Sequence, residues 1–199
     1  MNDISDLLRN ELLCHGADLV GFGDLTGLPA EVRESLPVGV CVAVLYPKEQ
    51  LANDNDYACD NALRDRLDKL VTLGTELLQM LGYQAVAKTR AQVSRTKLSH
   101  HVTLLPHRTV AILAGMGWVG KSKLLVHEQY GSMLRLSSIL TDAPLQCAKP
   151  IEPRCGNCTA CITACPANGD ITQCCSTDAV VCRKCIEVCP YTKRYLERR

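Results

Sequence analysis

Apolar residues near the amino terminus recur at the spacing of a helix. Five of them fall on one face when this stretch is wound as a helix: Ile4, Leu7, Leu8, Leu12 and Leu13. Asp3 stands where a capping residue is expected, and Gly16 stands where the helix would stop. The pattern predicts a first helix between these two residues.

A second, longer helix is predicted between Tyr57 and Leu81. Its apolar positions form one stripe: Leu63, Leu67, Leu70, Leu77 and Leu81. Charged residues occupy the other side: Arg64, Asp65, Arg66, Asp68 and Lys69. Such a helix is expected to pack its apolar stripe against a sheet or another helix.

Several short apolar runs bounded by glycine, proline or polar residues are typical of strands. They are "ADLVGFGDL", "VGVCVAVLYP", "YQAVAKT" and "MLRLSSILT". The segment "HRTVAILAGMG" is predicted to be helical. Helices and strands mix without strict alternation, so we expect an α+β fold around one sheet.

Composition sets the size and class of the protein. A chain of 199 residues has room for one ordinary domain and a small module. Apolar residues make up 47% of it, which suffices for a packed core, and 22 Lys and Arg nearly balance 21 Asp and Glu. The amino terminus lacks the pattern of a secretion signal, and no apolar run is long enough to cross a bilayer. We therefore expect a cytoplasmic protein with no membrane partner.

The cysteines divide the chain in two. Of 13 cysteines, nine fall between residues 155 and 189. In a reducing compartment such crowding indicates metal binding rather than disulfides. We expect an α+β domain over residues 1–146 that holds a cofactor, followed by a ferredoxin-like module over residues 147–199.

The cysteine spacing identifies the metal group. "CGNCTACITACP" is the C-x2-C-x2-C-x3-C-P run of bacterial ferredoxins, and "CRKCIEVCP" is a second, shorter run. In such proteins the fourth cysteine, followed by proline, binds the other cluster.

One 4Fe-4S cluster is then assigned to Cys155, Cys158, Cys161 and Cys189. A second is assigned to Cys165, Cys182 and Cys185, with Cys174 or Cys175 as its fourth ligand. A zinc ribbon from the two C-x2-C pairs is the alternative, but it leaves three cysteines and both prolines unexplained.

A basic stretch precedes the cysteines. No acidic residue occurs between Glu76 and Glu128, where seven Lys and Arg and four of the five histidines fall. This stretch is either a solvated basic face or a site for an anion, such as a cofactor phosphate or a nucleic-acid backbone.

The segment "GMGWVGKS", residues 115–122, matches the phosphate-binding loop of nucleotide hydrolases. Such a loop needs further strands and helices after it to complete a parallel sheet. Only residues 123–154 separate this loop from the first cluster cysteine. The surroundings therefore argue against a nucleotide site.

The same segment carries a family resemblance. "LPHRTVAILAGMGWVGKSKLLVHEQYGSMLRLSSILTDAPL", followed by two ferredoxin-type cysteine runs, resembles the epoxyqueuosine reductase family and its shorter relatives. The shared pattern is A-G-x-G-W-x-G-K, then Y/W-G-S, then T-D-x-P-L, ahead of a double-cluster module. The amino-terminal "GADLVGFGDL" looks like the family's opening strand.

The resemblance implies a fold, cofactors and partners. It implies a domain of the flavin-reductase or cobalamin-processing type, with a corrinoid between this domain and two 4Fe-4S clusters, and a flavin as the alternative. A low-potential donor would supply electrons, and the substrate of the tRNA-modifying members is the epoxide of a modified base. The chain stops at "YTKRYLERR", without the extension that longer members use for tRNA.

Individual residues take roles from the same resemblance. The candidate cofactor-binding residues are those of the glycine loop: Gly117, Trp118, Gly120, Lys121 and Ser122. His101 aligns, without gaps, with the family's presumed acidic proton donor, and a histidine can donate a proton near neutral pH. Trp118 as a core aromatic and Lys121 as a solvated lysine are the structural alternatives.

Three functions are compatible with these features. The first is a redox enzyme in which two clusters feed a corrinoid or flavin. The second is an electron carrier or reductive activator that docks on a corrinoid protein and has no substrate site. The third is a nucleotide-driven activator that uses the glycine loop.

Overall fold

The computed structural model describes residues 3–49, 57–95, 97–99, 102–167 and 182–198. The elements of the amino-terminal half are α1 Ile4–Cys14, β1 Leu19–Asp24, β2 Val38–Leu45, α2 Tyr57–Met80, β3 Ala85–Ala87, α3 Arg90–Arg95 and β4 Lys97–Ser99. Those of the rest are β5 Val102–Thr103, α4 His107–Leu113, β6 Trp118–Val119, β7 Leu125–Val126, β8 Leu134–Thr141, α5 Ala160–Thr163, α6 Lys184–Glu187 and α7 Pro190–Glu197.

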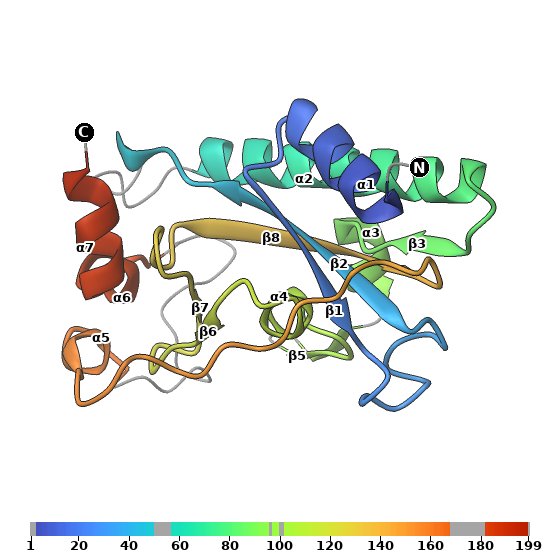
Figure 1. The fold of residues 1–199 in the computed structure, drawn as a ribbon. Coiled ribbons are helices and arrows are strands. Elements are labelled where there is room, and N and C mark those ends of the chain that lie inside the picture. The colour runs from blue at the N-terminus through green and yellow to red at the C-terminus, as the bar shows by residue number, and fades with distance from the viewer. Residues whose placement is uncertain (1–2, 50–56, 96, 100–101, 168–181, 199) are drawn as a thin grey trace.

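A four-stranded antiparallel sheet in the order β1-β2-β8-β3 forms the centre of the fold. Helices α1 and α2 cover one face of the sheet, and α4 covers the other (Figure 1). Strands β4 and β5 pair with each other, as do β6 and β7. The expected α+β fold around one sheet is confirmed.

Strand β2 shows why both faces of the sheet are covered. Its residues Val38, Val40, Val42 and Val44 point into the core under α1 and α2. Cys41 and Ala43, between them, belong to a second core under α4. Side chains alternate between the faces of a strand, so a strand that is apolar at every position needs cover on both sides.

The predicted helices and strands lie where the hydrophobic pattern placed them. Asp3 caps α1 by accepting a hydrogen bond from the Ser5 backbone N–H, and Gly16 follows the helix in a left-handed conformation. The helix predicted from "HRTVAILAGMG" ends at Leu113, before the glycines. None of the described helices has the length and apolar character needed to span a bilayer.

Helices α5, α6 and α7 gather at one end of the molecule, beside the β6–β7 hairpin (Figure 1). Of the described cysteines of the carboxyl-terminal runs, Cys161 lies in α5 and Cys185 in α6, and the others lie in the segments beside these helices. Tyr195 of α7 packs edge-on against Tyr130, and Ile186 and Leu196 pack against the core of the sheet. The cysteine-bearing helices are thus docked on the α+β part.

Candidate functional site: a cysteine hollow and a basic cavity

Four cysteines from distant parts of the sequence meet in one place. Cys155, Cys158, Cys161 and Cys189 line a small hollow of about 40 Å³. The first three belong to the loop before α5 and to α5 itself, and Cys189 directly precedes α7. These are the four residues that the spacing assigned to one cluster.

The electrostatics of the hollow show that these thiols lie close to one another. Burial raises the pKa of the Cys161 thiol, and negative charge on Cys189, Cys155 and Cys158 raises it further. Four cysteines this close can all be thiolates only with a cationic group among them, and a 4Fe-4S cluster takes four thiolates. In the described ranges, no three His, Cys, Asp or Glu side chains converge as ligands of a single metal ion. A 4Fe-4S cluster does not require several side chains to converge on one metal ion, because each of its four irons binds a different thiolate. The donor set therefore fits a cluster.

The second set of cysteines is described only in part. Cys165, Cys182 and Cys185 are each partly buried, and the helices α5 and α6 near them pack together. Cys174 and Cys175 lie outside the described residues. The assignment of the second cluster stays a prediction.

The glycine loop borders the cysteine hollow. Gly120, Lys121 and Ser122 line it together with Val126, Pro190 and Tyr191. Trp118 is 1% exposed, and its indole N–H donates a hydrogen bond to Cys155 Sγ over 3.5 Å. The Lys121 ammonium donates to the Gly156 carbonyl over 2.8 Å. The loop thus contacts cysteine-bearing segments.

Gly117 allows the loop to fold this tightly. A Cβ at this position would collide with the Val126 carbonyl oxygen and would lie 3.0 Å from its carbon. Val126 belongs to β7, which pairs with Trp118 of β6. Gly117, a candidate cofactor-binding residue in the sequence, thus serves a close approach between two strands.

The other two shared segments also have visible structural roles. In Tyr130-Gly131-Ser132, the Ser132 backbone N–H donates to Thr192 Oγ1 of α7 over 3.2 Å. In the T-D-x-P-L segment, Asp142 accepts a hydrogen bond from the Gln84 backbone N–H over 2.8 Å. The first segment holds α7, and the second fixes the edge of the sheet beside β3.

A larger cavity, of about 570 Å³, lies on the other side of the same loop. Its floor is β8, and its walls come from α2, α3, the start of α4 and residues 123–125. Six cationic side chains line it: Arg64, Lys88, Arg90, Arg108, Lys123 and Arg135. Its apolar lining consists of Leu67, Val93, Pro106, Leu124, Leu125, Leu134 and Leu136. Among the described residues that line the cavity, Asp68 is the only acidic one.

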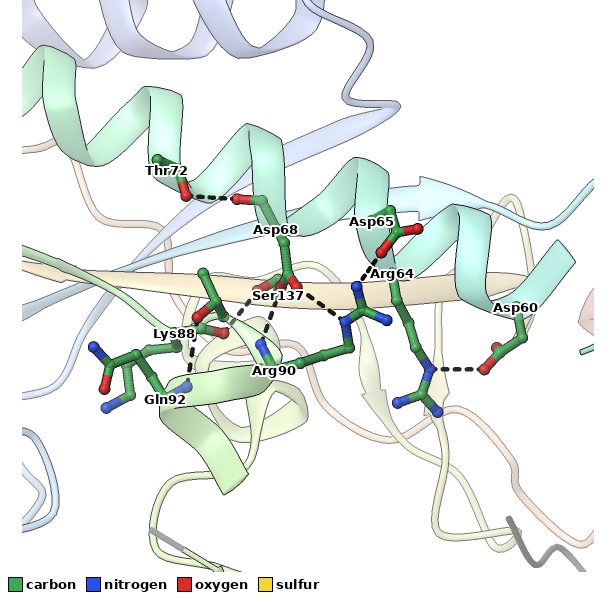
Figure 2. Close-up of polar contacts among 10 residues, drawn as sticks. Asp60, Arg64, Asp65, Asp68, Thr72, Lys88, Arg90, Gln92 and Ser137 are labelled. Carbon is green, nitrogen blue, oxygen red and sulfur yellow. Dashed lines mark hydrogen bonds and ion pairs between the residues drawn. The ribbon is translucent and has the colours of Figure 1, made fainter. Parts of the chain in front are cut away.

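Acids from outside the basic stretch hold some of these cations. Figure 2 shows Arg90 facing Asp68 and Asp65 of α2, with Arg90 Nε 2.9 Å from Asp68 Oδ2. Lys88 pairs with Glu34. At least two cations of the basic stretch, Lys88 and Arg90, are therefore paired with acidic residues from other parts of the sequence.

Asp60 organises the end of the cavity near Arg64 and Arg135. It accepts from Tyr46 Oη over 2.6 Å, Arg64 Nε over 2.7 Å and Arg135 Nη2 over 2.6 Å. Burial disfavours the charged form of this carboxyl, but Arg135, the Tyr46 hydroxyl and Arg64 outweigh that effect and lower its pKa. Asp60 thus stays ionised and keeps both guanidinium groups in place.

His107 is a site residue that the sequence did not single out. It lines the cavity, and its Nδ1 lies 2.9 Å from Ser138 Oγ. Burial, together with the charges of Lys88 and Arg135, lowers the pKa of His107 to about 4. This imidazole is neutral at physiological pH. The only local feature that sets His107 apart in the sequence is the proline before it. His101, the predicted proton donor, lies outside the described residues.

Comparisons with known proteins point to one family. No family model matches the chain. It is 34% identical over 134 residues to an epoxyqueuosine reductase of Bacillus cereus, which covers 67% of the chain and 31% of that relative. It is 32% identical over 124 residues to an epoxyqueuosine reductase of Aliivibrio fischeri, covering 62% of the chain and 29% of the relative. The chain thus matches about a third of the length of these curated relatives.

Solved structures share the fold. The structure of epoxyqueuosine reductase from Streptococcus thermophilus superimposes with a TM-score of 0.68 at 21% identity, over 97% of this chain and 67% of that one. An epoxyqueuosine reductase with an epoxyqueuosine-modified tRNA stem loop gives 0.64 at 20% identity, over 94% and 65%. A reductive dehalogenase whose structure suggests a mechanism for B12-dependent dehalogenation gives 0.62 at 19% identity, over 84% and 26%.

The curated relatives and several of the structural neighbours thus carry the same name, epoxyqueuosine reductase. The chain is similar to the epoxyqueuosine reductases in sequence over two thirds of its own length and in fold over nearly all of it.

Proposed function

We propose that this protein is an iron-sulfur oxidoreductase in which two 4Fe-4S clusters pass electrons to a cofactor held in the basic cavity. One observation carries the proposal. Residues 120–126 border both sites: Gly120, Lys121, Ser122 and Val126 line the cysteine hollow, whereas Lys123, Leu124 and Leu125 line the cavity. A cofactor in the cavity would be separated from the first cluster by a single loop.

The lining of the cavity suits a large cofactor with an apolar body and an anionic group. Leucines from β8 and from residues 124–125 would contact the body, while Arg108 and Lys123 would face a phosphate. A corrinoid meets this description, as does a flavin nucleotide, and either supplies a centre that accepts single electrons. The neutral His107 can hydrogen-bond such a cofactor without adding to the positive charge.

The cavity favours an enzyme over a carrier without a substrate site. A carrier that only docks on another protein needs no cavity of about 570 Å³ beside its cluster. Modified tRNA is the proposed substrate class, since one structural neighbour was solved with a tRNA stem loop. A low-potential electron donor and a cytoplasmic location complete the proposal. Residues 1–146 would form the cofactor domain, and residues 147–199 the ferredoxin-like module.

Anaerobic reconstitution with iron and sulfide, followed by titration with cobalamin and with FMN, tests this function. We expect about eight iron atoms per chain and saturable binding of one of the two ligands. Arg108→Glu should weaken that binding, because it places a negative charge on the cavity wall. Arg154→Glu is the matched control, because Arg154 pairs with Glu128 away from the cavity. An iron content of about four atoms would refute the two-cluster assignment, and binding of neither ligand would refute the cofactor site.

A further inference from the structure

The indole of Trp118 is held in one orientation beside the cysteine hollow. It is buried, and its N–H points at Cys155 Sγ. Its ring packs edge-on against Tyr191, with ring centroids 5.0 Å apart and an angle of 76° between the planes. Tyr191 follows Cys189 by two residues. Trp118 therefore contacts both chain segments that supply the four thiols.

Lys121 places a positive charge at the rim of the same hollow. Its ammonium donates to the carbonyl of Gly156, which lies between Cys155 and Cys158. The contact spans 35 residues of sequence. It fixes the charge against the loop that carries two of the thiols rather than leaving it in solvent.

Both groups act on the same physical quantity. One-electron reduction makes a cluster and its thiolates more negative by one charge, with no protein bond made or broken. Hydrogen bonds to the sulfurs tune the potential of a cluster. An N–H donor and a nearby cation stabilise the reduced form more than the oxidised form, especially where burial lowers the dielectric constant.

We propose that Trp118 and Lys121 raise the reduction potential of the cluster bound by Cys155, Cys158, Cys161 and Cys189. The segment that resembles a nucleotide loop then serves to set how readily this cluster accepts an electron. The inference rests on the proposed function, because it requires a cluster in the cysteine hollow.

A redox titration of reconstituted variants tests it. The protein is titrated anaerobically with dithionite, and the reduced clusters are quantified by EPR. Trp118→Phe keeps an aromatic ring but removes the N–H, and Lys121→Met removes the charge. For each variant we expect the equilibrium ratio of reduced to oxidised cluster at a fixed potential to fall between about threefold and tenfold. A tenfold fall corresponds to about 59 mV for one electron.

Two controls isolate the effect. Lys149→Met removes an exposed cation from the segment ahead of Cys155, but Lys149 lines neither the hollow nor the cavity, so the potential of the cluster in this variant should match that in the unmodified protein. Lys121→Arg should restore most of the shift caused by Lys121→Met. The second cluster provides an internal reference in every sample.

The outcomes separate this inference from the proposed function. Iron near zero in the unmodified protein would refute the cluster itself. Variants that retain their iron but keep the original potential would refute the role of the two residues alone. Lys121 is only partly buried, so Lys121→Met decides the question even if Trp118→Phe does not fold.

Discussion

Substitution of Gly131 tests how α7, the helix that follows Cys189, is held on the rest of the protein. This residue has a left-handed φ of 58°, where a non-glycine residue costs about 1–2 kcal/mol. A Cβ there would also overlap Thr192 of α7, reaching 2.6 Å from its Cα. Overpacking of this kind costs about 1–3 kcal/mol. Gly131→Ala should therefore destabilise the protein by about 2–5 kcal/mol.

Two other glycines separate the contributions. Gly82 also has a positive φ, of 89°, but nothing lies within 4 Å of its Cβ position. Gly27 has neither the strained backbone nor a neighbour. Gly82→Ala should cost only the backbone term of about 1 kcal/mol, and Gly27→Ala less than about 0.5 kcal/mol. Urea unfolding followed by circular dichroism measures all three, and iron content reports the cluster. If Gly131→Ala cost no more than Gly82→Ala, close packing of α7 on this turn would be disproved.

Two further predictions concern the cavity. His107 takes up a proton near its ordinary pKa of 6.5 when unfolded but only near pH 4 when folded. The free energy of unfolding should therefore fall as the pH drops from 6.5 to 4, by up to about 3 kcal/mol. Urea unfolding across this pH range measures this dependence, and His107→Gln should lose it. If the pH dependence is the same in His107→Gln, His107 is excluded as its source. Asp60→Ala should cost about 3–5 kcal/mol, since it leaves two guanidinium groups without their carboxylate. Asp65→Ala, on the exposed side of the same helix, should cost about 1 kcal/mol or less. If urea unfolding shows equal losses of stability in the two variants, the role given to Asp60 is contradicted.

Much of the fold is predictable because its elements are amphipathic or uniformly apolar over their whole length. The stripe from Leu63 to Leu77 predicted α2, and the apolar run "VGVCVAVLYP" predicted the strand β2. Both are local properties. The end of α4 at Leu113 was less visible, because "LAGMG" continues the apolar pattern past the point where the glycines turn the chain.

The candidate site was predictable only where spacing along the chain fixes spacing in space. The three cysteines of the first run are such a case, and Cys189 joined them through the ferredoxin pattern. The contact of Lys121 with Gly156 and the pairing of Lys88 with Glu34 join segments 35 and 54 residues apart. No periodicity or motif encodes such pairs, so the sequence left open whether the basic stretch is a solvated face or a site for an anion.

Magnetic coupling between a reduced cluster and a bound cofactor tests the central claim most directly. Reconstituted protein would be mixed anaerobically with one equivalent of Co(II) cobalamin, and its EPR spectrum recorded before and after reduction of the clusters with dithionite. The loop of residues 120–126 separates the cysteine hollow from the basic cavity. We therefore predict that cobalamin binds and that reduction of the cluster changes the Co(II) signal, either broadening it or, where the electron passes on to form EPR-silent Co(I), removing it, with Arg108→Glu abolishing the effect and Arg154→Glu preserving it. Cobalamin that binds but keeps an unchanged Co(II) signal, or protein that binds neither cobalamin nor FMN, would contradict a cofactor beside the cluster.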